Sequence, residues 1–188
     1  MRKASMIKYF YRIIKIGRNI KWRLIYMEQH QLVYDLLTNM KIPFEVVEHP
    51  PVLTAEEADK YIVGKEGVRT KTLFLTNQKK NTYYLIVLDD AKQLDMRYLA
   101  EKLHEKRMSF ASPQRLMNKM ALTPGSVSIF GLLNNAEHDI NVYFDKEILS
   151  ERLISFHPND NTKTIFLAIE DMFRFLTVID YEYTLIDL

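Results

Sequence analysis

The 188-residue chain contains no cysteine and only five glycines. Without cysteine there are no disulfides, thiol nucleophiles, iron–sulfur clusters or thiolate zinc sites, and the composition fits a reducing compartment. The glycines form neither a GxGxxG nor a GxxxxGK[ST] array, which argues against a dinucleotide-binding Rossmann turn and against a P-loop. The apolar runs near the N-terminus are too short for a signal peptide or a membrane span, so we expect a cytoplasmic protein without membrane contact.

The net charge of +2 hides an asymmetry between two parts of the chain. Residues 1–26 contain eight basic side chains and no acidic one, whereas residues 27–188 carry 18 basic and 24 acidic side chains. We interpret residues 1–26 as a basic N-terminal extension: either an arm that binds RNA or an anionic membrane surface, or a stretch upstream of a true start at Met27. Residues 27–188 form an acidic domain, which can bind nucleic acid only through a local basic site.

Helical and strand-like patterns alternate along residues 27–188, without linkers, repeats or low-complexity segments. The 3.6-residue spacing and the capping signals predict helices at 28–41, 54–62, 95–106, 113–120 and 170–178. Runs rich in β-branched and aromatic residues predict strands at 44–48, 71–76, 83–89, 108–111, 140–144, 152–156, 162–168 and 183–188, and a strand-like segment within 123–133. We therefore expect a single α/β domain with a mixed, curved β-sheet of about six to eight strands surrounded by helices.

The histidines and lysines offer weak chemical signals when taken one by one. The five histidines show no HxxxH or HxH spacing, so we expect no metal site. His157 ends a predicted strand and precedes Pro158, at an edge where functional sites form, but a purely structural histidine is also consistent with this position. Lys71 begins a strand of core residues and either holds an anion in a cleft or is simply solvated.

The segment Thr123–Gly131 reads TPGSVSIFG, with two glycines on either side of two serines after a proline turn. Backbone N–H groups in such a loop can face a carbonyl oxygen or a phosphate, although the same pattern is typical of a turn that enters a strand. A serine nucleophile is not indicated, because the GxSxG elbow is absent.

Four blocks in this order resemble one family. They are EVVEHPPVLTAEEADKY (45–61), KTLFL (71–75), TPGSVSIFGL (123–132) and FHPNDNTKTIFL (156–167). Together they resemble the freestanding prolyl-tRNA editing proteins of the YbaK/ProX superfamily, and the first block is similar to the alanyl-tRNA(Pro) deacylase branch. The resemblance covers about residues 27–188.

The resemblance implies an enzyme that hydrolyses the ester between a wrong amino acid, here alanine, and the terminal ribose of tRNA(Pro). It implies that Lys71 binds the terminal adenosine, that the Gly125 loop holds the aminoacyl carbonyl, and that His157 lines the pocket. Substrate-binding positions implied in the same way are Thr72, Ser126, Val127, Phe130, Gly131 and Asn161. The family uses neither a metal nor a cofactor, and a free ribose hydroxyl of the substrate is thought to activate water.

Two positions depart from the family pattern. Ile129 stands where the loop commonly has proline, and Thr72 stands where relatives often have asparagine. Expected partners are the acceptor end of tRNA(Pro) and, through the family, prolyl-tRNA synthetase or the elongation machinery; the sequence leaves the oligomeric state open. Two alternatives also stay open: a deacylase of another mischarged tRNA such as Cys-tRNA(Pro), and a non-catalytic module that binds tRNA or a synthetase.

Overall fold

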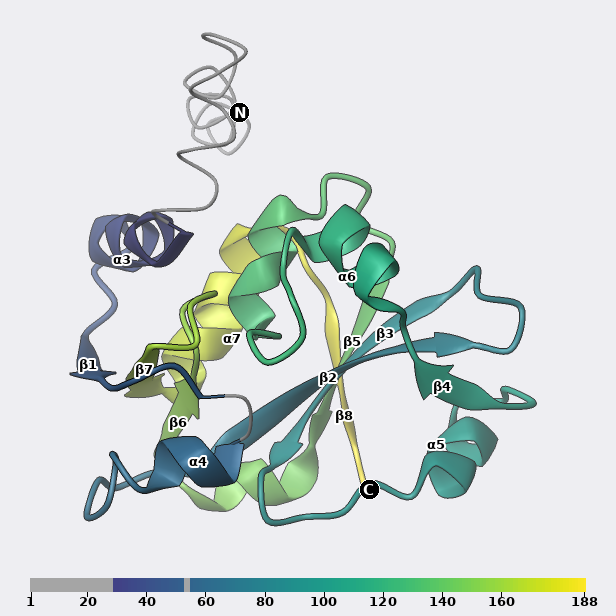
Figure 1. Ribbon diagram of the computed structural model, residues 1–188, viewed down its shortest axis with the longest axis horizontal. Helices are drawn as coiled ribbons and strands as arrows, with labels where there is room; N and C mark the ends of the chain where they lie inside the picture. Colours follow the sequence, from purple (N-terminus) through teal and green to yellow (C-terminus); the bar gives the residue numbers. More distant parts are fainter. Residues whose placement is uncertain (1–28, 53–54) are drawn as a thin grey trace, which may run out of the picture.

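The computed structural model of the protein describes residues 29–52 and 55–188 (Figure 1). The basic extension 1–26 lies outside the described residues. No helix in the described ranges is long and apolar enough to cross a membrane.

The described residues form an alternating series of helices and strands. In chain order these are α3 (Gln29–Asn39), β1 (Phe44–Glu48), α4 (Ala55–Asp59), β2 (Thr70–Asn77), β3 (Tyr83–Asp89), α5 (Met96–Lys102), β4 (Met108–Phe110), α6 (Pro113–Met120), the 3₁₀ helix η1 (Ile129–Asn134), β5 (Ile140–Asp145), the 3₁₀ helix η2 (Lys146–Ser150), β6 (Leu153–Phe156), β7 (Lys163–Ala168), α7 (Ile169–Val178) and β8 (Tyr183–Ile186). The expected α/β class is confirmed, and eight strands in these ranges agree with the expected six to eight. They form two sheets, however, and not the one mixed sheet that the sequence predicted.

The strands divide between two sheets. The larger sheet has the order β4-β2-β3-β5-β8 and is mixed, since β2 pairs antiparallel with β3 and β4 while β5 pairs parallel with β3 and β8. The smaller sheet has the antiparallel order β1-β7-β6. Figure 1 shows the long strands of the larger sheet crossing the middle of the molecule, with the smaller sheet beside one end of β2.

The two sheets meet where the chain enters β2. Val68 forms a parallel bridge with Ile154 of β6, the Val68 N–H donates to the Leu153 carbonyl at 2.9 Å, and the Thr70 hydroxyl donates to the Ser155 carbonyl at 2.5 Å. These bonds hold the start of β2 against the end of β6, so residues 70–74 and 155–157 face a common space.

Each face of the larger sheet has its own core. The larger core lies between this sheet, the smaller sheet and helices α3, α6 and α7, and it includes Phe130, Phe144 and Phe175, all fully buried. The smaller core lies under α5 and centres on Leu75, Ile86 and Leu99. Because apolar surface is covered on both faces, the central strand β3 is almost entirely buried.

The capping signals act as the sequence indicates. Asp95 accepts hydrogen bonds from the N–H groups of Arg97 and Tyr98 at the start of α5. Ser112 caps α6 with Pro113 in its first turn, and the helix ends at Met120 as predicted. Helix α5 stops at Lys102, shorter than predicted, and His104 soon after it has a φ of 55°, the left-handed geometry that ends helices.

The strand-like reading of residues 123–133 is wrong. After the turn this segment forms the 3₁₀ helix η1. The Ser128 side chain caps its start by accepting a hydrogen bond from the Phe130 N–H. A short apolar run bounded by turns fits a buried helical turn as well as a strand, and here all of Ile129–Leu132 is buried.

Candidate active site

A cavity of about 560 Å³ opens at the junction of the two sheets. Its floor comes from the start of β2, one side from α4 and Asp90 after β3, and another from the end of β6. The turn before η1 and the edge formed by β4 and α6 complete the wall. The volume lies in the range of small-molecule sites, and the cavity therefore is the principal candidate site.

Five of the residues singled out from the sequence line this cavity. They come from three segments that are far apart in the chain: Lys71 and Thr72 from β2, Gly125 and Val127 from the turn, and His157 after β6. The fold thus brings together the lysine, the glycine and the histidine on which the resemblance depends.

Lys71 is half-buried in the cavity wall. Its Nζ donates a hydrogen bond to the backbone carbonyl of Asp90 at 2.8 Å. This bond holds the ammonium group at the cavity surface and leaves its other two protons for a ligand, since a lysine ammonium carries three donors. Lys71 makes no ion pair with any described residue, so its charge is available to an anion or a carbonyl oxygen.

Two carboxyl groups that the sequence reading missed, Asp59 of α4 and Asp90, also line the cavity. Burial, followed by the charge of Asp59 and a hydrogen bond with it, raises the pKa of Asp90 to about 7. The Asp90 Oδ2 atom is buried and accepts no hydrogen bond from the described residues. A carboxyl group with a pKa near 7 can both hold and release a proton near neutral pH, so Asp90 is able to exchange a proton in this cavity.

Burial lowers the pKa of His157 to about 4, and the nearby His49 ring adds to this shift, while a hydrogen bond with the Gly125 backbone opposes it. The centroids of the His49 and His157 rings are 5.9 Å apart. His49 is itself engaged with the carbonyl of Pro50 and the hydroxyl of Thr164. His157 is therefore neutral at physiological pH and serves as a wall and hydrogen-bonding group, not as a cation.

The turn at Thr123–Ser126 places Gly125 against the cavity with a φ of 87°. Both the N–H and the hydroxyl of Ser126 point back into the turn and donate to the Thr123 carbonyl, at 3.1 and 2.9 Å. The N–H groups of Gly125 and Val127 donate to no group among the described residues. These two residues, and not Ser126, line the cavity and have a backbone N–H that is left to donate to a ligand.

Four of the expected substrate-binding residues lie elsewhere. Ser126 is absorbed in its own turn, and the Asn161 side chain donates to the Val52 carbonyl at 2.8 Å, which pins the loop after β1. Phe130 is fully buried against Phe156 and Phe175 in the core. Gly131 is a packing glycine, because a Cβ there would come within 2.6 Å of side-chain atoms of Leu122 and Met120. These four residues are close in sequence to residues that line the cavity, but they do not line it themselves.

The two departures from the family pattern have structural consequences. Ile129 is fully buried in the larger core, so the apolar side chain anchors the loop by packing. The cap from Ser128 adds a second anchor. Thr72 lines the cavity with a single hydroxyl where an amide would offer both a donor and an acceptor.

Several cavity residues carried no sequence signal that pointed to them. Phe110, at the end of the edge strand β4, is 63% exposed although it is aromatic. Arg69 donates hydrogen bonds to three carbonyls, of Ile62, Lys65 and Gly67, and so ties the loop after α4 to β2. A polar residue directly after a buried strand, as Asp90 is after β3, is the kind of signal that could have been used.

The described residues contain no group of three histidine, cysteine, aspartate or glutamate side chains placed to hold a metal ion. The polar groups that line the cavity include the Lys71 ammonium, the Asp59 and Asp90 carboxyls and the His157 imidazole.

Comparison with known proteins adds an independent line of evidence. The model of a family described as the aminoacyl-tRNA editing domain matches residues 49–175, which include all five cavity residues named above. The prolyl-tRNA editing protein ProX of Acetoanaerobium sticklandii is 37% identical over 146 residues, covering 78% of this chain and 89% of the relative. The prolyl-tRNA synthetase associated domain-containing protein 1 of Bos taurus is 30% identical over 144 residues, covering 74% and 84%.

A solved structure described as "a putative trans-editing enzyme for prolyl tRNA synthetase" superposes with a TM-score of 0.65 at 18% identity, covering 85% of this chain and 96% of that one. At this identity the likeness concerns the fold alone, and it places the two-sheet arrangement in a known architecture.

Proposed function

The chain belongs to the aminoacyl-tRNA editing domain family, and from this premise we propose that it is a trans-editing hydrolase that deacylates mischarged tRNA(Pro), with Ala-tRNA(Pro) as its main substrate. The observation that carries the proposal is the single cavity that gathers Lys71, the Gly125 turn and His157 from three distant segments.

Alanine is a plausible substrate because it is smaller than proline. A synthetic site built for proline cannot strongly reject a smaller amino acid, because a missing methylene is worth only about 1–3 kcal/mol. A second, hydrolytic pocket can remove the error if it admits alanine and excludes proline by size. In this proposal the Gly125 turn and the neutral His157 form the narrow end that receives the amino acid.

Lys71 positions the substrate in the proposed complex. Its ammonium group, held by the Asp90 carbonyl, binds the phosphate or an oxygen of the terminal adenosine and so sets the ester against the Gly125 turn. The N–H groups of Gly125 and Val127 then stabilise the negative charge that develops on the carbonyl oxygen.

The reaction consists of the attack of one water molecule on the ester carbonyl carbon. The bond from that carbon to the ribose oxygen breaks, the ribose oxygen takes a proton, and free alanine and tRNA(Pro) leave. A free ribose hydroxyl of the substrate helps to orient the water, and Asp90 lies in the same cavity with a pKa of about 7, so it is able to exchange a proton. Positioning and oxyanion stabilisation supply most of the rate gain, without a cofactor.

The test is deacylation of purified Ala-tRNA(Pro), Cys-tRNA(Pro) and Pro-tRNA(Pro) by the full chain. We expect rapid loss of alanine, slower loss of cysteine, and Pro-tRNA(Pro) hydrolysed no faster than in buffer. Faster hydrolysis of Cys-tRNA(Pro) than of Ala-tRNA(Pro) would contradict the proposed alanine specificity but would still support the deacylase activity. Tight binding of tRNA(Pro) without hydrolysis of any of the three would instead identify a non-catalytic binding module.

A further inference from the structure

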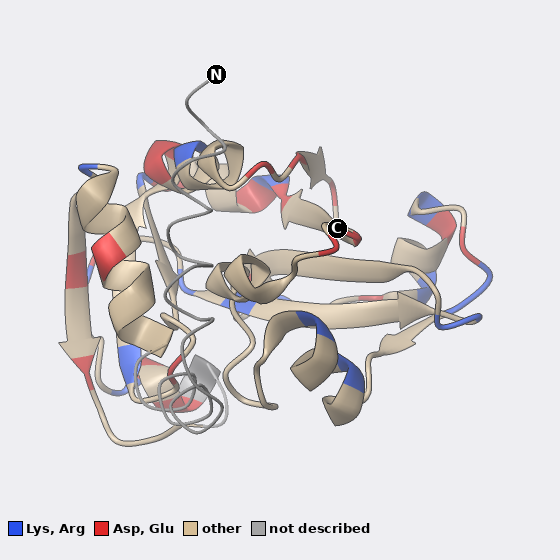
Figure 2. Cartoon of the chain, turned by 90° about the horizontal axis from the view of Figure 1, so that it is seen from above, with Lys and Arg blue, Asp and Glu red and all other residues tan. Residues whose placement is uncertain are grey.

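The end of the long β2–β3 hairpin carries four basic side chains that have no ionic partner. Lys79 and Lys80 lie in the hairpin turn, and Lys106 and Arg107 lie in the loop that leads from α5 to β4. All four are exposed, and none forms an ion pair within the described part of the chain. Figure 2 shows lysine and arginine gathered in the loops at this end of the long strands.

The nearest acidic side chain along this loop is already engaged. Glu105 accepts hydrogen bonds from the Asn77 amide at 3.1 Å and from the Tyr84 hydroxyl at 2.7 Å, so its carboxylate is turned toward the strands. We call the set Lys79, Lys80, Lys106 and Arg107 the hairpin-tip patch. It stands out because residues 29–188 carry more acidic than basic side chains.

The strand register connects the hairpin-tip patch to the cavity. Met108 pairs with Asn77 and Phe110 pairs with Leu75, so Arg107 lies beside the hairpin turn while Phe110 lies at the cavity. Phe110 follows Arg107 by three positions, which is about 10 Å along a strand. Strand β4 is the edge of its sheet, so its outer side pairs with no other described strand, and Arg107 and Phe110 at its two ends are both exposed.

The order of groups along this edge fits a single-stranded nucleic acid that leads into a stem. An exposed aromatic ring offers a stacking surface to any base, and base–aromatic stacking is worth about 1–3 kcal/mol. Cations farther along the edge offer contacts to phosphates. An acidic domain repels RNA elsewhere on its surface, which leaves this edge as its favourable approach.

We propose that the β4 edge binds the 3′ acceptor strand of the tRNA, with Phe110 stacking on a base of the single-stranded end and the hairpin-tip patch contacting the phosphates that follow. The inference rests on the proposed function, because it takes the aminoacyl ester to lie in the cavity. It goes beyond it by assigning to named residues the surface that receives the RNA.

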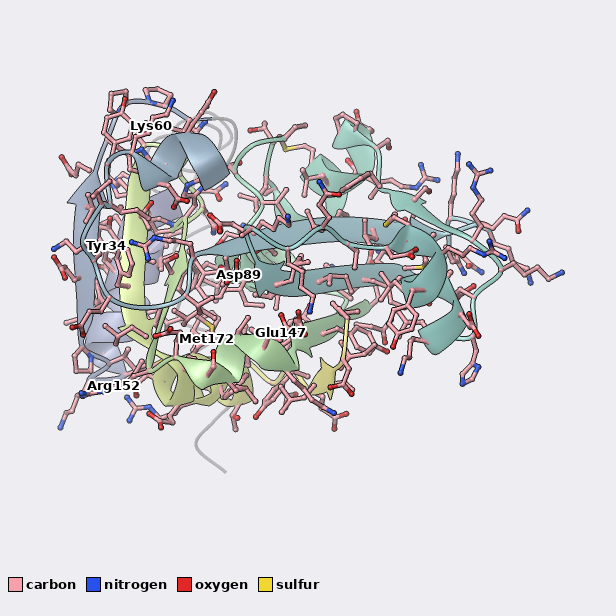
Figure 3. The ribbon with its side chains drawn as sticks, turned by 90° about the horizontal axis from the view of Figure 1, so that it is seen from below. Tyr34, Lys60, Asp89, Glu147, Arg152 and Met172 are labelled. Carbon is pink, nitrogen blue, oxygen red and sulfur yellow. The ribbon has the colours of Figure 1, made fainter. Side chains whose placement is uncertain are left out.

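Two double variants, one in the hairpin-tip patch and one control, test the proposal with the same types of substitution. Lys80→Asn with Arg107→Gln neutralises two patch charges, whereas Lys41→Asn with Arg152→Gln neutralises two exposed charges elsewhere. Lys80 and Lys41 have φ values of 58° and 55°, and asparagine tolerates this conformation in both. Figure 3 labels Arg152 at the end of the molecule beside the smaller sheet, away from the hairpin.

Binding of deacylated tRNA(Pro) to the full chain is measured as a function of KCl concentration. For the patch variant we expect affinity at low salt to fall about five- to ten-fold and the slope of log K against log salt to fall by about 1.4–1.8, since each phosphate contact contributes about 0.7–0.9. The control variant is expected to stay within two-fold of wild type. Equal affinities and slopes for the two variants would overturn the proposal.

Hydrolysis of 2′(3′)-O-alanyladenosine separates this inference from the proposed function, because that ester reaches the cavity but not the patch. The patch variant is expected to hydrolyse it like wild type while its KM for Ala-tRNA(Pro) rises. If the wild-type protein hydrolyses neither alanyladenosine nor Ala-tRNA(Pro), the proposed function is refuted. If it hydrolyses both, and the patch variant has an unchanged KM for Ala-tRNA(Pro), only the proposed RNA surface is refuted. Phe110→Leu keeps an apolar side chain but loses the aromatic face, and we expect it to raise the KM for both substrates by about ten-fold.

Discussion

Lys71 combines a structural contact with a free charge. Its bond to the Asp90 carbonyl orients the ammonium group, and no described acidic side chain neutralises it. A cation held in this way is suited to bind an anionic or carbonyl oxygen of a substrate, because a charge-assisted hydrogen bond is worth more than a neutral one.

We predict that Lys71→Ala lowers the deacylation rate of Ala-tRNA(Pro) by about ten-fold or more, since hydrogen bonds to charged groups contribute about 1.5–3 kcal/mol. Lys71→Met, which keeps the apolar stem, should lose a similar factor if the charge is what matters. Single-turnover kinetics measure the effect, and circular dichroism checks that both variants are folded. Wild-type turnover by a folded Lys71→Ala protein would remove this residue from the site.

Asp90 should make stability depend on pH in an unusual direction. Its pKa is about 7 in the folded protein against an ordinary value of 3.8, so the folded state binds a proton more tightly than the unfolded state between these values. The contribution of Asp90 to stability therefore falls as pH rises from about 4 through 7, and the cost of ionising Asp90 is fully present above pH 7.

We predict that Asp90→Asn raises the unfolding temperature at pH 8 by about 2–4 °C, the effect of roughly 1 kcal/mol in a domain of this size, and that the gain shrinks toward pH 4. The effect is small because Asp90 borders an open cavity, where solvent screens its charge. Glu66→Gln, at an exposed position, is the control and should show no such trend. A gain that is the same at pH 4 and pH 8 would exclude the linked proton.

At the scale of elements, different groups in the turn before η1 have different structural and functional roles. Its hydroxyl and one N–H hold the turn closed on the Thr123 carbonyl, its glycine faces the cavity, and its apolar residues enter the core. The functional surface is therefore backbone, and the side chains on either side hold it in place.

We predict that Gly125→Ala reduces hydrolysis by about 10²–10³, the usual value of one oxyanion contact, because alanine is strained at a φ of 87° and its methyl group would distort the turn. Ser126→Ala should be much milder in rate, since its hydroxyl is bonded within the turn and is not a nucleophile. Steady-state kinetics rank the two. The reverse order, with an acyl-serine trapped by mass spectrometry, would establish a covalent mechanism instead.

At the scale of the whole molecule, the site depends on how the two sheets cross. Gly67 lies directly at this crossing with a φ of 108°, and a Cβ there would come within 2.7 Å of the Leu153 Cβ and 2.8 Å of the Leu153 carbonyl oxygen. Gly64 in the same loop has a φ of 79° but open space around it. Comparing alanine substitutions at Gly64 and Gly67 therefore distinguishes the effect of backbone strain from the effect of a steric clash.

We predict that Gly64→Ala lowers the free energy of unfolding by about 1 kcal/mol through strain alone. Gly67→Ala should cost about 3 kcal/mol, because the contact with β6 adds an overpacking penalty of about 1–3 kcal/mol. Urea unfolding measures both values. Since the crossing also shapes the cavity, Gly67→Ala should lose deacylation under conditions in which it remains folded, and equal costs for the two variants would mean that the crossing tolerates a methyl group.

The local pattern of this sequence determined much of the fold. Runs rich in β-branched and aromatic residues predicted β1 and the β2–β3 hairpin to within a residue, and helical spacing did the same for α7. Ser112 with Pro113 predicted the start of α6, and its expected end at Met120 is also confirmed. These elements could be predicted because their causes, side-chain periodicity and capping, lie within a few residues of each other in the chain. The ordered motifs likewise pointed to the family.

What only the tertiary structure decided is which residues share a space. The resemblance implied that Phe130 and Gly131 bind the substrate, yet the chain turns into the core after Val127. It missed Asp59 and Asp90, which come together only because α4 and the end of β3 meet over the cavity. Contacts between distant segments depend on the packing of two sheets across long loops, and that packing reflects the sum of many apolar contacts which no local pattern records.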